Sequence, residues 1–380
     1  MTNNLNIKPL RAAFIGGSIN SAVGYAHFVS STMDNLWVVD AGCFSLNTER
    51  NHKTAEAYGV EPGRVYDNWR EMLKKEKDRL DAVIILTPTQ SHYEMVIETL
   101  EAGFPVICEK ALGTTSSEAE QILKTRDRTN GFLAVIYNYS AYPMVRELQN
   151  LIKKGILGDI IHFQAEMPQE GYLRIDASGN KIIPQTWRLH DGFVPTIHLD
   201  LAVHLHELIY YLTGQRPIET ISDQNSFGWF PEVIDNVTCL SRYTNGIHGQ
   251  YWFSKSAIGH RNGLRLRIYG RKASAEWYQA TPEELIVSYS DGRKEILERG
   301  AALEVVNLHR YNRFKSGHPA GFIEAFANLY YDIADALHQY RESGTWKSEQ
   351  VFSAELAIEG LKFFEAMIDS CKSKKWERVK

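Results

Sequence analysis

The sequence has few cysteines, no long apolar run and little net charge, and each of these features argues against a class of protein. Its four cysteines, Cys43, Cys108, Cys239 and Cys371, form no C-x-x-C pair and lie far apart. This usage is typical of buried, reduced thiols in a cytosolic protein. No apolar run approaches the ~18 residues of a membrane helix, and the opening MTNNLNIKP has no hydrophobic signal segment. We therefore expect a cytoplasmic protein with no membrane partner.

The net charge bears on the binding partners to expect, and the length on the number of domains. The net charge is −4 at pH 7, with 23% charged residues, which gives no reason to expect a nucleic-acid partner. We find no internal repeat and no low-complexity segment. At 380 residues the chain is long for one hydrophobic core, so we expect two domains, at residues 1–137 and 138–380. The C-terminal helices could pack back on the first domain.

The first domain alternates apolar runs with helical patterns, which predicts a doubly wound parallel sheet. Right-handed crossovers place the carboxyl ends of all its strands at one edge, where such sheets bind ligands. Gly16, Ser45, Thr87 and Lys110 follow successive runs and would share that edge. The runs are residues 10–16, 36–44, 81–86, 106–108 and 132–137.

The first of these runs enters a turn of small residues and then a helical pattern. Strand, small-residue turn and helix is the context of a dinucleotide-binding fingerprint, in which the helix N-terminus faces a pyrophosphate. The spacing is imperfect, because a G-x-G-x-x-G pattern would have glycine at position 18. An ordinary strand–helix turn is the alternative. The candidate cofactor-binding residues here are Gly16, Gly17, Ser18, Ile19 and Asn20.

The end of the second run bears on the choice between NAD and NADP. Ser45 stands where an acid would hold the ribose hydroxyls of NAD. With Arg50 close behind, this position could accept the phosphate of NADP. Arg50 could equally be a solvated residue early in the next helix. The cofactor is therefore predicted as NAD or NADP.

The second half of the chain changes pattern. Short alternating segments between residues 218 and 297 predict a large, mostly antiparallel sheet with one face buried. Two helices are expected at about residues 320–342 and 348–370. The terminal KSKKWERVK is interpreted as a solvated tail. The fold class is thus α/β, with a parallel-sheet domain followed by an α/β domain built on an open sheet.

A second group of chemical side chains lies in the helical segment IHLDLAVHLHEL. Asp200 and His204 are four residues apart, on one helical face, where a carboxylate can orient an imidazole. His204 could then take a hydroxyl proton as hydride leaves the carbon, while Lys110 hydrogen-bonds the same oxygen. The alternative to a catalytic pair is that Asp200 and His204 lie on a solvent-exposed helix face. His198 and His206 are nearby, but no H-E-x-x-H spacing is present, and we expect no metal.

Several motifs together resemble the Gfo/Idh/MocA family of NAD(P)-dependent oxidoreductases, over nearly the whole chain. They follow a glycine-rich first turn and are TPTQSHY at Thr87–Tyr93, CEKALG at Cys108–Gly113, WR at Trp187–Arg188 and DLAVH at Asp200–His204. YNYSAYPMVREL at Tyr137–Leu148 and GHPAGFIEAFANLYYD at Gly317–Asp332 resemble a longer-chain branch of that family.

The resemblance implies a Rossmann domain, a C-terminal α/β domain that often builds dimers or tetramers, and redox chemistry on a secondary hydroxyl of a sugar, sugar derivative or cyclitol. The lysine of the family's E-K-P motif, between nicotinamide and substrate, matches Lys110. The family's aspartate and acid/base histidine match Asp200 and His204. Trp187 and Arg188 match residues at the cofactor–substrate junction. Thr87, Pro88, His92 and Glu109 are further cofactor candidates.

Two departures from the family pattern keep other functions open. E-K-P is Glu109-Lys110-Ala111 here, and Ser18 replaces a usual glycine. A cofactor-sensing regulatory protein without catalysis, or a redox-assisted glycoside-cleaving enzyme, are the alternatives to a dehydrogenase. Retention of Lys110, Asp200 and His204 favours catalysis. Further candidates for the substrate pocket are Tyr139, Tyr172, Arg188 and His318.

Overall fold

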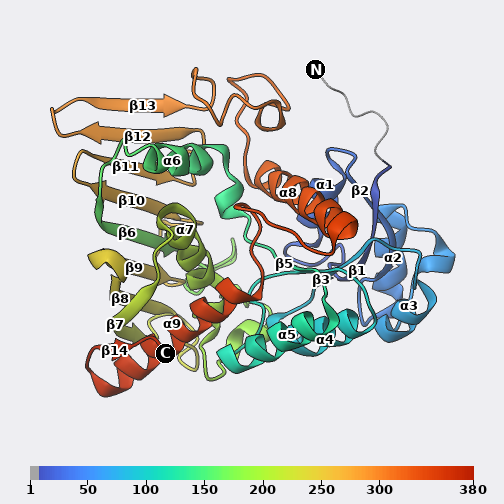
Figure 1. Cartoon of the computed structure of the whole chain (residues 1–380). Helices are drawn as coiled ribbons and strands as arrows, with labels where there is room; N and C mark the ends of the chain where they lie inside the picture. The colour runs from blue at the N-terminus through green and yellow to red at the C-terminus, as the bar shows by residue number, and fades with distance from the viewer. Residues whose placement is uncertain (1–7) are drawn as a thin grey trace. The chain divides into compact units, whose positions relative to one another are not determined.

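The chain divides into two units in the computed structural model, which describes residues 8–380 (Figure 1). Unit 1 comprises the described residues up to Gly113, Ser117–Ala141 and Phe322–Ala357. Unit 2 comprises Thr114–Ser116, Tyr142–Gly321 and Ile358–Lys380. The N-terminal residues 1–7, where the sequence predicts no signal segment, lie outside the described part. Within residues 8–380, no helix has the length and apolar character that a membrane span requires.

Unit 1 is built on a five-stranded parallel sheet in the order β2-β1-β3-β4-β5, which confirms the predicted fold class. β3 consists entirely of buried apolar residues, as expected for a strand covered on both faces. Residue 16 pairs with residue 86, and residue 85 with residue 108, so the ends of β1, β3 and β4 are neighbours. The strands are β1 (Leu10–Gly16), β2 (Trp37–Cys43), β3 (Ala82–Leu86), β4 (Val106–Cys108) and β5 (Leu133–Val135).

Six helices accompany this sheet, and local signals define several of their ends. The side chain of Asn47 accepts a hydrogen bond from Arg50 N and so caps α2, which ends at Gly59 in a left-handed conformation (φ 71°). The helices are α1 (Gly24–Thr32), α2 (Thr48–Tyr58), α3 (Trp69–Lys75), α4 (His92–Glu101), α5 (Ser116–Thr129) and α8 (Phe322–Ser343).

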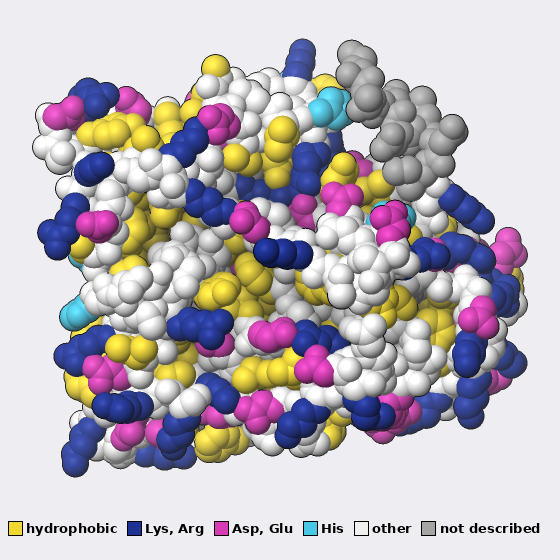
Figure 2. Space-filling view, viewed as in Figure 1, with side chains coloured by type: hydrophobic (Ala, Val, Ile, Leu, Met, Phe, Trp, Pro, Cys, Tyr) yellow, Lys and Arg dark blue, Asp and Glu magenta, His cyan; other side chains and the backbone are white. Residues whose placement is uncertain are grey.

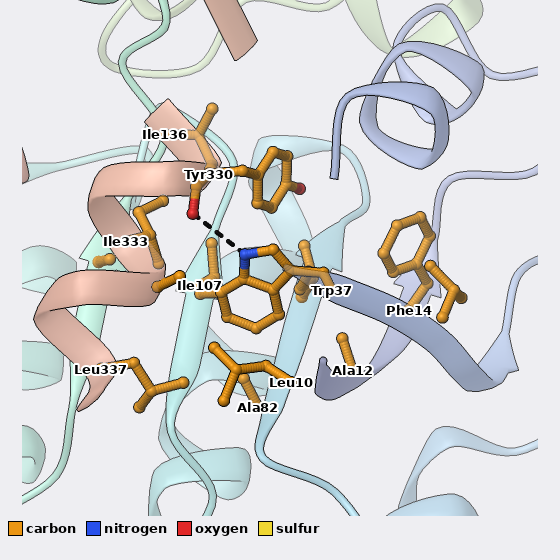
Figure 3. Packing of buried hydrophobic residues seen from close by; sticks show 14 of the residues in the cluster. Leu10, Ala12, Phe14, Trp37, Ala82, Ile107, Ile136, Tyr330, Ile333 and Leu337 are labelled. Atoms are coloured by element: carbon orange, nitrogen blue, oxygen red, sulfur yellow. Dashed lines mark hydrogen bonds between the residues drawn. The ribbon is translucent and has the colours of Figure 1, made fainter. Parts of the chain in front are cut away.

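Helix α8 comes from the C-terminal part of the chain and packs into the core of unit 1. Its residues Tyr330, Ile333 and Leu337 join the cluster that contains Trp37 and Ile107 (Figure 3). The indole N–H of Trp37 donates to the backbone carbonyl of Tyr330 at 3.0 Å, the dashed line in the same figure. Burying each large apolar side chain contributes roughly 1.5–3 kcal/mol, so this helix is firmly attached to the first unit.

Unit 2 is built on a nine-stranded sheet in the order β13-β12-β11-β10-β6-β9-β8-β7-β14. All its pairs are antiparallel except β6 with β9, which confirms the predicted mostly antiparallel sheet. Alternate residues of β8 and β11 are buried, as expected for a sheet with one covered face. The strands are β6 (Ile160–Pro168), β7 (Pro217–Asn225), β8 (Asn236–Tyr243), β9 (His248–Ser254), β10 (Arg265–Gly270), β11 (Ala273–Tyr278), β12 (Glu284–Tyr289), β13 (Lys294–Glu298) and β14 (Glu377–Arg378).

Strand β14 corrects the interpretation of the C-terminus as a solvated tail. Glu377 and Arg378 pair with Thr220 and Glu219 of β7, and Trp376 packs under the guanidinium of Arg242. The pairing satisfies backbone groups that β7 would otherwise present at an open sheet edge. The helices of unit 2 are α6 (Pro143–Lys153), α7 (Val203–Thr213) and most of α9 (Ala354–Ser373).

The surface carries charges of both signs. On the face shown in Figure 2, Lys and Arg side chains are interspersed with Asp and Glu side chains. This distribution matches the small net charge of the sequence. It provides no broad basic field on that face to attract a polyanion.

Candidate functional site

The turn between β1 and α1 has the geometry that a dinucleotide requires. Gly16 and Gly17 have φ values of 81° and 73°, in the left-handed region that favours glycine. A Cβ at Gly17 would lie 2.6 Å from Leu86 Cδ1, so the turn sits directly against the end of β3. The Tyr58 hydroxyl donates to the carbonyl of Gly17 at 3.1 Å and fixes the turn from α2.

A third glycine, Gly24, stands at the first position of α1. A Cβ there would lie 2.2 Å from the carbonyl oxygen of Gly17, so only glycine allows the helix to approach the turn this closely. The Ser21 hydroxyl accepts from the Gly24 N–H at 3.1 Å. Tight turn, close helix and helix N-terminus are the features that hold a pyrophosphate, so these residues fit a dinucleotide.

The other residues predicted around the cofactor take different positions in unit 1. Ser18 is buried beside the turn, whereas Ile19 and Asn20 are exposed. Ser45 follows β2, and its hydroxyl accepts from Asn47 N at 3.2 Å. Arg50 is exposed in the first turn of α2. An exposed guanidinium near the end of β2 leaves both NAD and NADP possible.

Lys110 lies two residues beyond β4, at the edge where Gly16 ends β1 and Thr87 follows β3. Pro88 is exposed beside Thr87. The Lys110 side chain is half-buried, while Ala111 behind it is buried. The peptide bond between Lys110 and Ala111 is cis.

His92 and Glu109 are buried around this segment. The ring nitrogens of His92 lie 2.7 Å from the carbonyl oxygens of Ala111 and Thr87. Glu109 accepts the Lys110 N–H at 3.0 Å through one carboxylate oxygen. Its other oxygen lies 2.9 Å from Nε2 of His27, a fully buried residue of α1.

In unit 2, one carboxylate oxygen of Asp200 receives two cations. The guanidinium of Arg188 and the ammonium of Lys255 both contact Asp200 Oδ2. The side chains of Asp200, Arg188 and Lys255 are 13%, 22% and 5% exposed, so this charge cluster is poorly solvated. Two cations favour the ionised carboxylate. Asp200 is therefore held as an anion in a fixed position.

Tyr172 also lies beside Lys255. Its hydroxyl donates to the carbonyl of Arg188 at 2.8 Å, and its ring lies 5.2 Å from the Lys255 ammonium. Burial raises the pKa of Tyr172, so the phenol stays neutral. Lys255 follows β9 directly and Tyr172 lies shortly after β6. Because these two strands are parallel, their carboxyl ends bring the two residues to one edge of the sheet.

Asp200 and the histidines near it in the sequence lie on two consecutive helical elements. Asp200 lies in a π-helical segment, His198–Ala202, and buried His204 follows in the first turn of α7. Burial lowers the pKa of His198 to about 3, and burial with nearby Arg216 does the same to His206. Among residues 8–380, no group of three or more His, Cys, Asp or Glu side chains could hold a metal ion.

The remaining predicted residues have other neighbours within their own units. The Trp187 ring stacks under the Arg188 guanidinium, 4.3 Å away. His318 is exposed and packs on Phe314. Tyr139 belongs to unit 1, where it is buried against Phe322.

Sequence reasoning missed three residues: Gly24 at the glycine turn, His27 beside Glu109, and Lys255 beside Asp200. Gly24 could have been found as a small residue at the predicted helix start. Nothing in the local pattern marks His27 or Lys255, because their partners are distant in the chain.

A glycine turn in a parallel sheet, a lysine at the same edge and a second unit on an open sheet are the features expected of an NAD(P)-dependent oxidoreductase. A family model described as "Oxidoreductase family, NAD-binding Rossmann fold" matches residues 10–137. A second model, "GFO/IDH/MocA C-terminal domain", matches residues 145–276. The chain belongs to the Gfo/Idh/MocA family of oxidoreductases.

Individual relatives support the same family. "Uncharacterized oxidoreductase YfiI" of Bacillus subtilis is 31% identical over 96% of this chain and 95% of its own. "D-glucoside 3-dehydrogenase" of Escherichia coli is 25% identical over 91% and 99%. The structure of an inositol dehydrogenase homolog from Azotobacter vinelandii, complexed with NADH and myo-inositol, is 27% identical with a TM-score of 0.87 over 98% of each chain.

Proposed function

We propose that this protein transfers hydride between a nicotinamide cofactor and a secondary hydroxyl or ketone of a sugar, sugar derivative or cyclitol. The observation that carries the proposal is the position of Lys110 beyond β4, at the same sheet edge as the Gly16–Gly17 turn. A cation at that edge is available to the reacting end of a dinucleotide bound across the turn.

In the proposed reaction, the Lys110 ammonium hydrogen-bonds the substrate oxygen and stabilises the negative charge that develops there. His204 accepts the hydroxyl proton during oxidation and returns it during reduction. The nicotinamide ring supplies the hydride acceptor or donor. Asp200, held ionised by Arg188 and Lys255, provides a fixed charge and a hydrogen-bond acceptor for substrate hydroxyls.

Further residues are assigned to binding within the same proposal. Tyr172, Tyr139, Arg188 and His318 contribute to the substrate pocket. For the cofactor, the glycine turn and the helix N-terminus of α1 hold the pyrophosphate, and Trp187 and Arg188 line the junction with substrate. The other proposed cofactor contacts are Ser18, Ile19, Asn20, Ser45, Arg50, Thr87, Pro88, His92 and Glu109. The working form is proposed to be a cytoplasmic homodimer or homotetramer.

The names and ligands of relatives support the proposed substrate class. D-glucoside 3-dehydrogenase and the inositol dehydrogenase homolog carry names or ligands of neutral, polyhydroxylated rings. "Levoglucosan dehydrogenase" of Pseudarthrobacter phenanthrenivorans, 25% identical over 66% of this chain, has a name of the same kind. An acidic and basic side-chain pair such as Asp200 and Arg188 suits the alternating hydroxyls of such a ring.

A panel of sugars and cyclitols, each offered with NAD⁺ and NADP⁺, tests the proposal by the absorbance of the reduced nicotinamide. We expect turnover with at least one ring polyol. Binding of cofactor without reduction of it by any member of the panel would refute the proposal and favour the cofactor-sensing alternative.

A further inference from the structure

The backbone on both sides of the Lys110 side chain is held by buried histidines of unit 1. On one side, Glu109 accepts the Lys110 N–H at 3.0 Å while His27 Nε2 contacts the same carboxylate at 2.9 Å. On the other side, His92 Nδ1 lies 2.7 Å from the carbonyl oxygen of Ala111. Both imidazoles are 0% exposed, so water does not compete for these contacts.

His27 links Tyr330 to Glu109 through its two ring nitrogens. His27 Nδ1 lies 2.7 Å from the hydroxyl of Tyr330, a residue of α8 that is 1% exposed. Burial and the nearby carboxylate of Glu109 raise the pKa of Tyr330 well above its usual value, so the phenol keeps its proton and can donate it. With its proton on Nε2, the His27 ring donates to Glu109 and accepts from the Tyr330 hydroxyl.

His92 lies between two sheet-edge loops. Its Nε2 lies 2.7 Å from the carbonyl of Thr87, after β3, and its Nδ1 contacts Ala111, after β4. Carbonyl oxygens only accept hydrogen bonds, so the full bridge requires protons on both ring nitrogens. Burial lowers the pKa of His92, and nearby Lys110 adds to this effect, while both carbonyls and Glu109 oppose it. The neutral ring has one N–H, which donates to one of the two carbonyl oxygens at a time.

These contacts bear on the departure from the family's E-K-P motif. A proline would restrict the backbone of the preceding lysine through its ring, and Ala111 lacks that ring. We propose that His27, through Glu109, and His92 are positioning residues that restrain the backbone of Lys110 where alanine replaces proline. The inference rests on the proposed function, in which Lys110 acts at the reacting oxygen.

Hydrogen exchange of the Lys110 amide, measured on the full chain in a peptide spanning residues 106–113, reports the restraint without relying on activity. His27→Phe keeps an aromatic ring against Phe326, 4.7 Å away, but removes both nitrogens. We expect it to speed exchange of this amide about fivefold or more, in line with the loss of one hydrogen bond. Tyr330→Phe removes only a hydroxyl and is expected to speed exchange of the same amide. It serves as the test variant if His27→Phe folds poorly.

Two variants control for altered packing of α1 and α8. Ser30→Ala removes a 2.9 Å hydrogen bond from α1 to the carbonyl of Ile323, and Tyr340→Phe removes a 2.7 Å bond from α8 to Asn130. Neither change touches Glu109. Both should leave exchange of the Lys110 amide at its wild-type rate.

Turnover and rescue complete the test. His27→Phe and His92→Asn should lower kcat about tenfold while changing the dissociation constant for NADH less than about threefold, because misplacement of a reacting group lowers the rate more than the binding. Adding Ala111→Pro should recover part of the lost kcat, since proline restores a restraint within the backbone itself. Unchanged exchange in both His27→Phe and Tyr330→Phe would overturn the inference.

The failure of the proposed function gives a different result. If Lys110→Ala turns over at the wild-type rate, Lys110 is not catalytic and the proposed function fails, whatever the exchange data show. If Lys110→Ala is inactive but His27→Phe and His92→Asn both have wild-type kcat, the positioning roles fail and the proposed function stands.

Discussion

The ammonium of Lys255 forms an ion pair with the carboxylate of Asp200 inside unit 2, although 55 positions separate them in the chain. Arg188 contacts the same carboxylate oxygen. The aspartate that the sequence pairs with His204 is thus already held by two cations. A fixed anion, rather than a proton acceptor, is the role that this arrangement suits.

Lys255→Met tests that role by removing one cation while keeping an unbranched side chain. We expect kcat/KM to fall about tenfold or more, because the carboxylate loses one of the two cations that fix its position. Lys255→Arg should recover part of the activity. The measurement is steady-state kinetics.

Loss of a buried cation also costs stability, roughly 3–5 kcal/mol when one partner of a buried pair is removed. Arg64→Met is the matched control, since Arg64 is 8% exposed and pairs with buried Glu76, and neither residue is assigned to the site. Equal activity losses in Lys255→Met and Arg64→Met would show that the effect is a general destabilisation.

Lys110→Ala and His204→Ala should each abolish turnover and leave dinucleotide binding nearly intact. General acid–base groups contribute roughly 10²–10⁴-fold, and neither residue belongs to the glycine turn. Turnover and NADH binding are measured on the same preparations. Lys181→Ala, an exposed lysine stacked on Trp229, controls for loss of positive charge. Oxidation at the wild-type rate by either site variant would contradict its assigned role.

Arg50→Ala should lower the affinity for NADP⁺ about tenfold and leave the affinity for NAD⁺ unchanged, if the exposed guanidinium after Ser45 contacts the ribose phosphate. Titration of both dinucleotides provides the measurement. Lys53→Ala removes an exposed cation one turn further along α2, paired there with Glu49, and should alter neither affinity. Equal weakening of the two dinucleotides by Arg50→Ala would argue against phosphate recognition.

The stability of the fold should decrease as the pH falls below neutrality, partly because of His198. Burial lowers the pKa of His198 from 6.5 to about 3 in the folded chain. Between these values the unfolded chain binds a proton that the folded chain does not, so stability is complete above pH 6.5 and is lost as the pH falls toward 3. At about 1.4 kcal/mol per pKa unit, the loss reaches several kcal/mol.

His198→Phe removes the titrating ring and keeps the aromatic packing on Phe253 and Phe364. Both ring nitrogens of His198 lack hydrogen-bond partners within the described structure, so the change discards no hydrogen bond. We expect a Tm that falls less between pH 7 and pH 5 than in the wild type. The exposed His162, stacked on Tyr269, provides the control variant His162→Phe. Parallel Tm curves for wild type and His198→Phe would show that His198 does not carry the effect.

Much of unit 1 could be predicted from local pattern. The apolar run at β3 and the small residues after β1 identify parallel strands and a turn. The crossover rule then places Gly16, Thr87 and Lys110 at one edge, as the structure has them. The C-terminal segment is largely exposed, as predicted, but it is not a free tail. Its pairing was missed because nothing local shows that Glu377 and Arg378 would find the open edge of β7.

The alternation of strands and helices, and with it the edge that presents Lys110, can be predicted from the sequence because both depend on short-range periodicity and backbone chirality. Which distant side chains surround the reactive groups depends on the tertiary fold. Lys255 reaches Asp200, and Tyr330 of α8 reaches His27 across 303 positions, through packing of buried surfaces. Hydrophobic burial is non-directional, so the chain pattern marks which faces are buried without naming their partners.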